Sequence, residues 1–539
     1  MSGSPFEDIL HTNVVPSDAQ CDDIRAFLVG PCKELADLTE EIERLQSLLD
    51  QTTEKRDKLK QCVDTHFALV SPMRRLPDDI LREVFVETLP STRNTAIIST
   101  EGPLLLCRVC KLWRSIALTT PRLWASMHIV VPDRARIHRL IDILRSWLGR
   151  SGTVPLAITM LLSQTWTPDC NVAAVLAFLA SASRQWKDLE FTLPLNGDDV
   201  TALSAVSSED VPVLRSVKIR LTIRQPPSAD LGNVVGPAQV HFPFLAAQSL
   251  RGFVFHGPYE SLPSPVSWGT LRYLTFYESS SSFAWSILGQ CTMLERCEIR
   301  IGDGPALATP TEPICLPFLS HLSLETYVLN MNHEDVLRIF DDLSLPHLTS
   351  LRLHTYQEAE LSGVLLRLMH PLRCLDIVAH SMRSEYLVEV LAAMDSLEEL
   401  ILNGEPRLSG NLPLGMWGMP GDDAFLTHLT PPRDGAGPNL CPRLRRIKLL
   451  GFQVLSDAVL LQFVRARTLD RSQANNVAPL THVVCVLDRR MDLDLEQDLH
   501  DVIAGGLSLS ISYNHNFWQP GVAYSPLEGT WNTSENAAN

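Results

Sequence analysis

A short apolar pattern that returns along most of the chain constrains the fold more than any other feature of the sequence. Apolar residues occur at positions i, i+3 and i+5, usually just after a proline. The last two positions alternate as on a β-strand with one inward face, and the first tucks in from the preceding turn. Each triplet therefore predicts a strand. The triplets are Trp186/Leu189/Phe191, Leu214/Val217/Ile219, Leu250/Phe253/Phe255, Leu271/Leu274/Phe276, Leu294/Cys297/Ile299, Leu319/Leu322/Leu324, Leu348/Leu351/Leu353, Leu372/Leu375/Ile377, Leu397/Leu400/Leu402, Leu444/Ile447/Leu449 and Leu480/Val483/Cys485.

The spacing of these triplets predicts a stack of similar units. Most of their middle members recur every 21–29 residues, and helical stretches such as 335–340 and 386–391 lie between them. One strand and one helix cannot bury their own apolar face, so the units must stack with their strands in a parallel sheet. The pattern resembles leucine-rich repeats. We therefore expect an α/β fold with an irregular leucine-rich-repeat solenoid over residues 134–505.

The repeats depart from the regular form of that family. Leucine-rich repeats place an asparagine three residues after the last leucine of the strand, where its amide bonds neighbouring backbone. Here those positions hold Ser279, Gly302, Tyr327, Tyr356, His380, Glu405 and Phe452. We therefore expect uneven curvature, with individual units missing or distorted. The alternative is an unrelated α/β domain whose leucines are spaced by chance.

Residues 32–66 predict a helix with a coiled-coil seam. Its apolar residues alternate by three and four, as the a and d positions of a left-handed coiled coil do. They are Leu35, Leu38, Ile42, Leu45 and Leu49, followed by Leu59 and Val63 after an interruption at Thr52 and Arg56. Two outcomes stay open: self-association of two chains through this seam, and a helix that folds back on its own chain. Residues 1–31 are expected to be disordered or loosely ordered.

Residues 72–126 predict two short helices with apolar faces. The first begins at Leu76-Pro77, because proline fits the first turn of a helix. Its apolar residues are Ile80, Leu81, Val84 and Phe85. The second helix carries Leu104, Leu105, Leu106, Val109, Leu112 and Trp113, and Ile116 and Leu118 continue its apolar stripe. Both faces must be buried against something.

These two helices carry a family resemblance. The Leu-Pro opening, the Ile-Leu-x-x-Val-Phe core and the Val-Cys-Lys-x-Trp-Arg segment, in that order, resemble an F-box. The trailing Pro-Arg-Leu-Trp at 121–124 and the preceding coiled coil are similar to the large F-box group of mushroom-forming fungi. One departure is a polar insert at residues 91–102, which lengthens the loop between the helices.

The resemblance implies a docking role. An F-box binds the Skp adaptor of a cullin ubiquitin ligase, and the chain would be the substrate-recognition subunit that holds an unknown target protein on its repeats. The resemblance then implies no catalytic residues, metal or cofactor in the chain itself. The residues implied to bury into the adaptor are Leu76, Pro77, Ile80, Leu81, Val84, Phe85, Val109 and Trp113.

Other classes of function compete with this interpretation. In a non-ligase interaction scaffold the same helices would join the core of the repeats, so burial separates the two hypotheses. A hydrolase whose site is assembled from distant residues is a third class, although the sequence has no G-x-S-x-G, H-E-x-x-H or nucleotide-binding glycine loop. The acidic run 492–498 begins like a calcium loop but has Gln497 where glycine is required.

Two further segments are candidates for contact with a target. The long connection 403–442 contains Met416, Trp417 and Met419, residue types favoured at protein-binding sites. Alternatively, Trp417 packs this loop onto the solenoid. Residues 506–539 would either cap the last repeat or form a disordered tail.

Charge and composition exclude several partners. The net charge of −16 argues against a nucleic-acid footprint, which needs a basic patch. No apolar run is long enough for a membrane span, and no signal peptide is visible at the start, so we expect a cytoplasmic or nuclear protein. The twelve cysteines are then expected to be buried thiols. Cys107 and Cys110 lack the second pair that a zinc site requires.

Overall fold

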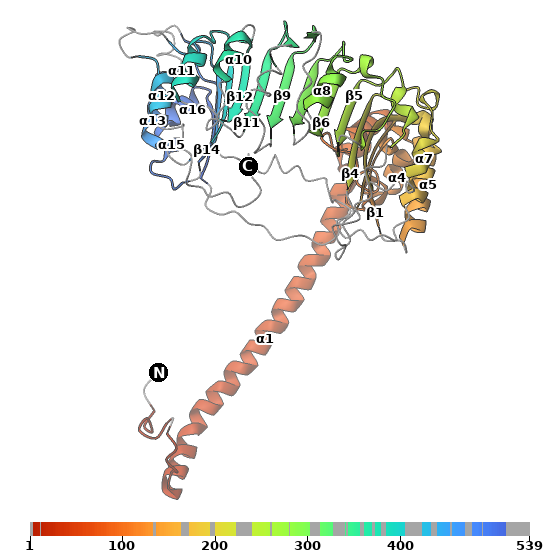
Figure 1. Ribbon diagram of the computed structural model, residues 1–539. Helices are drawn as coiled ribbons and strands as arrows, with labels where there is room; N and C mark the ends of the chain where they lie inside the picture. The colour runs from red at the N-terminus through yellow and green to blue at the C-terminus, as the bar shows by residue number, and fades with distance from the viewer. Residues whose placement is uncertain are drawn as a thin grey trace. The chain divides into compact units, whose positions relative to one another are not determined.

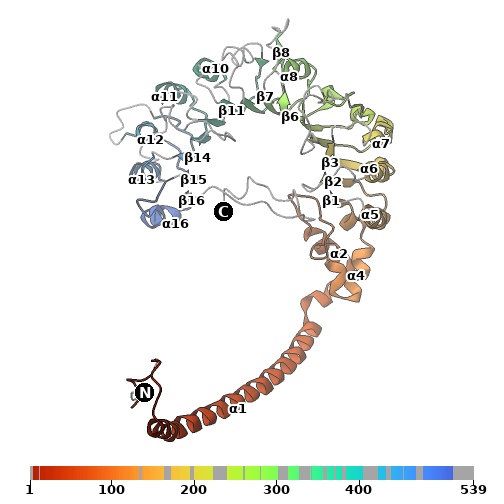
Figure 2. The ribbon, with the colours of Figure 1, turned by 60° about the horizontal axis from the view of Figure 1, so that its bottom comes forward.

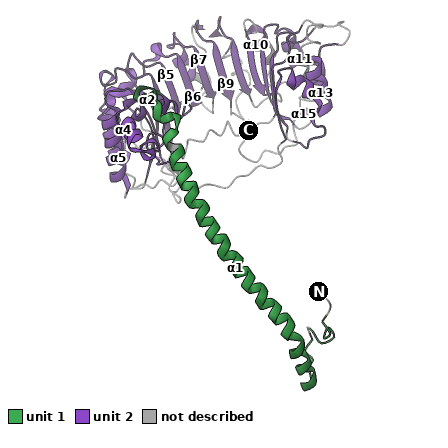
Figure 3. Cartoon of the chain, turned by 180° about the vertical axis from the view of Figure 1, so that it is seen from behind, with its two compact units in different colours: residues 1–83 green, residues 84–539 purple. Residues whose placement is uncertain are grey.

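The chain divides into two compact units, Met1–Glu83 and Val84–Asn539 (Figure 3). The expected mixed α/β class is confirmed, with a long N-terminal helix and a large parallel sheet. The computed structural model describes residues 4–10, 12–132, 136–162, 172–194, 200–222, 240–258, 261–279, 281–301, 313–326, 340, 343–355, 361–368, 372–378, 384–404, 423–432, 439–452, 455–468, 477–487 and 489–513.

The first unit consists mainly of helix α1, Asp18–Val70, which spans 53 residues (Figure 1). It begins earlier than the residue 32 that the leucine seam suggested, so residues 18–31 are helical rather than loosely ordered. The physical reason is a capping box, in which the Ser17 hydroxyl accepts from the Gln20 N–H and the Gln20 side chain accepts from the Ser17 N–H. Pro31 lies inside the helix, at a position where proline removes one backbone hydrogen bond.

Three short α-helices follow before the sheet. The 3₁₀ turn Pro72–Arg75 precedes α2, Asp78–Glu87, and the second predicted helix is in fact two, α3, Leu106–Val109, and α4, Lys111–Leu118. The break falls at Cys110, whose backbone is extended with φ −156° and ψ 173°. Its thiol accepts a hydrogen bond from the Trp113 N–H at 3.4 Å and so caps the start of α4.

The second unit is built on one parallel sheet. Among the described residues the sheet has 14 strands, and each strand pairs with the one that precedes it in the chain, with the two-residue strands β8 and β10 left out. Its strands are β1 Ser126–Val131, β2 Leu156–Leu162, β3 Trp186–Pro194, β4 Ser216–Thr222, β5 Gly252–His256, β6 Tyr273–Ser279, β7 Arg296–Ile301, β9 His321–Thr326, β11 Ser350–Thr355, β12 Cys374–Val378, β13 Glu399–Asn403, β14 Arg446–Phe452, β15 His482–Leu487 and β16 Ser508–Tyr513.

All eleven apolar triplets contribute to this sheet in one register. Their middle residues lie directly opposite one another from β3 to β15 and form a continuous row across the sheet. The last residue of each triplet is buried on the same face. The first residue is buried in the segment before the strand, except for Trp186, which is buried as the first residue of β3. The middle row runs Leu189, Val217, Phe253, Leu274, Cys297, Leu322, Leu351, Leu375, Leu400, Ile447 and Val483.

Helices cover the face of the sheet on which the triplets lie. Figure 2 shows the strands along the inner side of the second unit and the helices along its outer side. The predicted helical stretch 386–391 lies in α11, whereas of 335–340 only Phe340 is among the described residues. The helices are α5 Ile137–Ser151, α6 Val172–Ala180, α7 Thr201–Ser204, α8 Ser281–Leu288, α10 Leu361–Leu368, α11 Ser384–Ala392, α12 Asp423–Leu429, α13 Asp457–Ala466, α15 Leu495–Asp498 and α16 His500–Ala504.

The sheet extends beyond both predicted limits. Strand β1 precedes residue 134, where we expected the repeats to begin, and β16 lies in the segment that we expected to be a cap or a disordered tail. At the first end Trp124 packs edge-on against Trp147 of α5, with ring centroids 4.8 Å apart. This contact ties the turn before β1 to the first covering helix. No described helix combines the length and the apolarity needed to cross a lipid bilayer.

Candidate functional site

Helix α2 separates its apolar residues into an exposed pair and a buried pair. Ile80 and Val84 lie one turn apart and remain 46% and 36% exposed. Leu81 and Phe85, the next residues along, are fully buried. The broad apolar face that the sequence predicts for α2 is therefore divided in two. The side with Leu81 and Phe85 is covered, and the side with Ile80 and Val84 is accessible to a partner.

Helices α3 and α4 repeat this arrangement. Val109 is 54% exposed, and Leu105 and Leu112 are also exposed. Trp113 is half-buried because its ring lies 4.7 Å from that of Phe85. Leu106, Ile116 and Ala117 are buried, so these helices too have one covered side and one exposed side.

The implied docking residues therefore separate into three groups. Pro77, Ile80, Val84 and Val109 are exposed, and Leu76 and Trp113 are half-buried. Leu81 and Phe85 are buried, because neighbouring positions on a helix point to different sides. Sequence reasoning left out Leu105 and Leu112, although both stand in the apolar run that it identified.

The polar insert between α2 and α3 is an ordered part of the second unit. The Thr95 carbonyl accepts a hydrogen bond from the His128 N–H at 2.7 Å, and Ala96 bridges to His128 as a parallel strand would. Arg93 and Glu101 close the loop with two charge-assisted bonds of 3.0 and 2.8 Å. The insert therefore fixes the segment between α2 and α3 against β1.

Polar side chains cover the face of the sheet that the helices leave open. Asp376 of β12 is the best anchored of these side chains and is almost fully buried. Its carboxylate accepts hydrogen bonds from Arg352 Nε at 2.6 Å and from the Asn403 amide at 2.8 Å, and His354 Nε2 lies 2.8 Å away. Burial alone would raise the pKa of Asp376, but the bond to His354 and the charges of His354 and Arg352 outweigh it and lower the pKa.

A second cluster on this face stacks side chains from neighbouring strands. The His256 ring lies parallel to the Tyr277 ring, with centroids 3.6 Å apart. The Arg300 guanidinium lies 4.5 Å from the Tyr277 ring centre and pairs with Glu325 at 2.6 Å. Burial, together with the positive charges of Arg220, Lys218 and Arg300, lowers the pKa of His256 to about 3. His256 is therefore neutral at physiological pH.

Most charges on this face are satisfied by a neighbouring strand. Lys218 pairs with Glu190 at 2.6 Å, and Glu399 pairs with both Arg446 and Lys448 at 3.2 and 3.4 Å. Such partly exposed pairs contribute little stability. They do present alternating charges and hydrogen-bonding groups across several strands.

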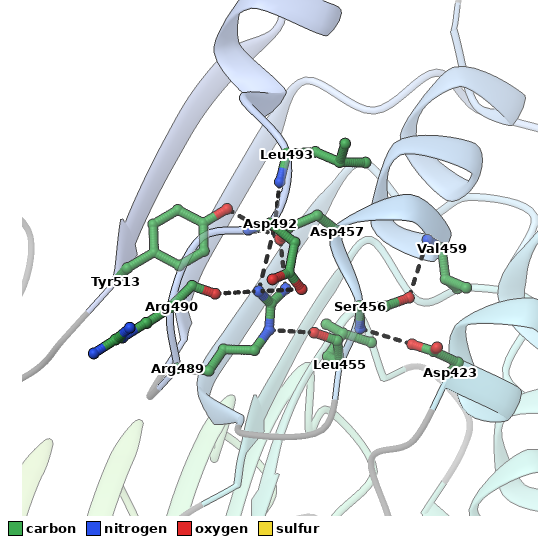
Figure 4. Close-up of polar contacts among 10 residues, drawn as sticks. All are labelled: Asp423, Leu455, Ser456, Asp457, Val459, Arg489, Arg490, Asp492, Leu493 and Tyr513. Atoms are coloured by element: carbon green, nitrogen blue, oxygen red, sulfur yellow. Dashed lines mark hydrogen bonds and ion pairs between the residues drawn. The ribbon is translucent and has the colours of Figure 1, made fainter.

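The last strands are held by one buried carboxylate, Asp457, at the start of α13 (Figure 4). It pairs with Arg489 and accepts hydrogen bonds from the N–H groups of Asp492 and Leu493 at 2.8 and 3.0 Å and from the Tyr513 hydroxyl at 3.0 Å. Burial alone would raise the pKa of Asp457, but these hydrogen bonds together lower it. The cluster thus joins α13, the loop after β15 and strand β16.

A buried arginine lies near this end of the sheet. Arg467 donates to the backbone carbonyls of Leu429, Leu440 and Cys441 at distances of 2.7–3.3 Å. Burial lowers its pKa to about 10, so it keeps its charge. Among the described residues no carboxylate pairs with Arg467, and its hydrogen-bond partners are backbone carbonyl groups. Arg467 therefore fixes the residues before β14.

The described residues offer few features for metal or thiol chemistry. No group of three or more His, Cys, Asp or Glu side chains among them is placed to hold a metal ion. Each described cysteine is a free thiol, and Cys32, Cys62, Cys110 and Cys315 are exposed, which corrects the expectation of buried thiols. The candidate target-binding residues Met416, Trp417 and Met419 lie outside the described residues.

Comparison with known proteins adds no relative. A scan of the sequence against models of protein families finds no match, and a search among curated proteins finds no similar sequence. The function is therefore inferred from the residues and their geometry.

Proposed function

We propose that this chain is the substrate-recognition subunit of a Skp–cullin–F-box ubiquitin ligase. One observation carries the proposal: Ile80, Val84 and Val109, together with Leu105 and Leu112, stay exposed on or next to short helices that also bury apolar residues such as Leu81 and Phe85. In a scaffold that used these helices only as core, the same side chains would be covered. Exposed apolar residues on successive short helices are typical of a surface that binds another protein.

The proposed target-binding part is a leucine-rich-repeat solenoid. Support comes from the strand order, which follows the chain, and from the single register of the apolar triplets. Of the seven positions named above, at which regular repeats carry asparagine, Ser279 and Phe452 are among the described residues. In this proposal the target lies on the polar face that includes Arg352, His354 and Asp376.

The mechanism is proximity. The short helices bind the adaptor, and the sheet holds a target protein so that its lysines are near the ubiquitin-charged enzyme. Holding two reactants together raises their effective concentration, and the receptor needs no chemistry of its own.

A pull-down with a purified Skp adaptor tests this proposal. We expect wild type to retain the adaptor, and the variant Ile80→Ser plus Val109→Ser to lose most of it, because both side chains would be buried in the complex. Ile143→Ser is the matched control, since Ile143 on α5 is 44% exposed and lies outside the proposed surface. Leu76→Ala plus Pro77→Ala provides a second variant.

Two results would contradict the proposal. Equal recovery of adaptor by wild type and both docking variants would remove these residues from any docking surface. Failure of wild type to bind the adaptor at all would favour the non-ligase scaffold, in which the repeats bring proteins together without a ligase.

A further inference from the structure

The heptad pattern of α1 runs through most of the helix, and its apolar residues are exposed. The a and d residues from Leu35 to Val63 that are Leu, Ile or Val are 43–66% exposed. In the a positions stand Leu28, Leu35, Ile42, Leu49, Arg56 and Val63, and in the d positions Pro31, Leu38, Leu45, Thr52, Leu59 and His66. An exposed seam of this kind is stable in water when a second helix covers it.

The distribution of charged residues along α1 indicates which helix covers the seam. Every charged residue from 34 to 43 is acidic, whereas residues 55–60 carry four basic side chains and one acidic one. The g positions Glu34 and Lys55 have no ion-pair partner in the part of the chain that the structure describes. Glu41, the other acidic g residue, pairs within its own helix with Arg44 at 2.6 Å, an exposed contact that is easily exchanged.

A parallel pair of these helices would be repulsive. Residues at g and at the following e position face each other across a parallel coiled coil. Lys55 at g would then face Lys60 at e of the second helix, twice in each dimer. Arg56, at an a position, would meet its own copy in the seam. Like charges at these positions oppose that orientation.

An antiparallel pair removes these conflicts. It brings the acidic stretch 34–43 of one helix opposite the basic stretch 55–60 of the other, and g positions then face g positions. Lys55 would face Glu34 or Glu41, according to the register of the seam. We infer that α1 joins two copies of this chain in an antiparallel coiled coil over about residues 28–63.

This orientation has a geometric consequence. An α-helix rises 1.5 Å per residue, so the two copies of Val70 would lie roughly 70–80 Å apart. The parts of the two chains that follow α1 would start at opposite ends of the pair. The inference does not rest on the proposed adaptor binding, and failure of that binding would leave it untouched.

Sedimentation velocity of the full-length chain tests the inference. We expect wild type to form dimers, and Leu38→Ala plus Leu45→Ala to form monomers. Lys55→Glu should weaken the dimer roughly tenfold, since each dimer loses two attractive pairs and gains two repulsive ones. Lys33→Glu, at an outward f position, makes the same charge change and should leave the dissociation constant unchanged.

A charge exchange separates the two orientations. Glu34→Lys plus Glu41→Lys should weaken the dimer, and adding Lys55→Glu to that variant should restore most of the affinity. In a parallel dimer Lys55→Glu would instead face Lys60 and tighten association, so a tighter dimer overturns the inference. A wild-type chain that stays monomeric at all concentrations overturns it as well.

Discussion

Two leucine patterns in this chain differ in whether their side chains are buried. In the sheet, Leu351 belongs to a row of triplet residues and is 0% exposed, because the strands on either side place equivalent residues next to it. In α1, Leu38 belongs to the heptad seam and is 57% exposed. A periodic row of leucines thus predicts an apolar surface that something must cover. Whether the same chain covers it depends on whether the unit that carries the row is repeated along the sequence. The triplets repeat and cover one another, whereas the heptads form one helix only.

The largest expected effect concerns Asp457, a buried charge that helps to hold the last strands of the sheet. Asp457→Ala should lower the free energy of unfolding by about 4 kcal/mol, because it leaves Arg489 and two backbone N–H groups without their acceptor in a buried site. Since the folded state lowers the pKa of Asp457, its contribution is present above the unfolded value of about 3.9 and is lost as pH falls through the folded pKa.

Urea denaturation at neutral and at acid pH measures this effect. The control is Asp501→Ala, an exposed acid on α16. If both variants unfold at the same urea concentration, the cluster in Figure 4 does not hold the end of the sheet.

The next largest effect contrasts the two leucines directly. Leu351→Ala should cost about 3 kcal/mol, from lost burial and the cavity left behind. Leu38→Ala, with its side chain exposed, should change the stability of a single chain by no more than about 0.5 kcal/mol. Thermal unfolding of dilute protein compares them. Equal shifts of the two melting temperatures would break the contrast between covered and uncovered leucines.

A smaller effect concerns His256, whose pKa is lowered mainly by burial. The pKa of His256 is lowered to about 3, so the unfolded chain binds a proton more readily between that pH and about 6.5. Stability should therefore fall as pH decreases through this range, by roughly 1 kcal/mol at pH 5 after allowance for partial exposure. His256→Gln should remove that dependence, as urea midpoints at pH 7 and pH 5 would show. If wild type and His256→Gln lost the same stability between pH 7 and pH 5, the His256 ring would be solvated in the folded protein.

The smallest effect on stability is expected at the exposed apolar residues of the short helices. Ile80→Ser should leave the unfolding free energy within about 0.5 kcal/mol of wild type. Leu81→Ala, one residue away and buried, should cost about 3 kcal/mol. Chemical denaturation of both variants tests whether α2 has one free face and one covered face. A large loss for Ile80→Ser would assign that residue to the core.

The sheet could be predicted largely from sequence, because each triplet combines a turn with a one-sided strand. Strand β16 was missed since Gly506 stands where the first apolar residue of its triplet belongs, before Leu509 and Ile511. Strand β1 does fit the pattern, with Trp124, Met127 and Ile129. Trp124 was assigned to the helical segment 72–126, however, and Met127 and Ile129 precede residue 134, where the repeats were expected to begin.

The candidate surfaces were harder to predict. Nothing in the order Ile80-Leu81 shows which of two adjacent apolar residues is covered, because that depends on packing across the chain. The cluster around Asp376 draws Arg352 and Asn403 from two other strands, so it requires the register of three strands. Spacing along the chain carries no such information.

The bridge between Ala96 and His128 has a consequence for aggregation. The outer edge of β1 would otherwise present free backbone groups, which are a template for pairing with another chain. The insert pairs with this edge at His128, whose N–H donates to the Thr95 carbonyl. A chain in which this pairing has frayed would expose more of its first strand and become more prone to aggregate.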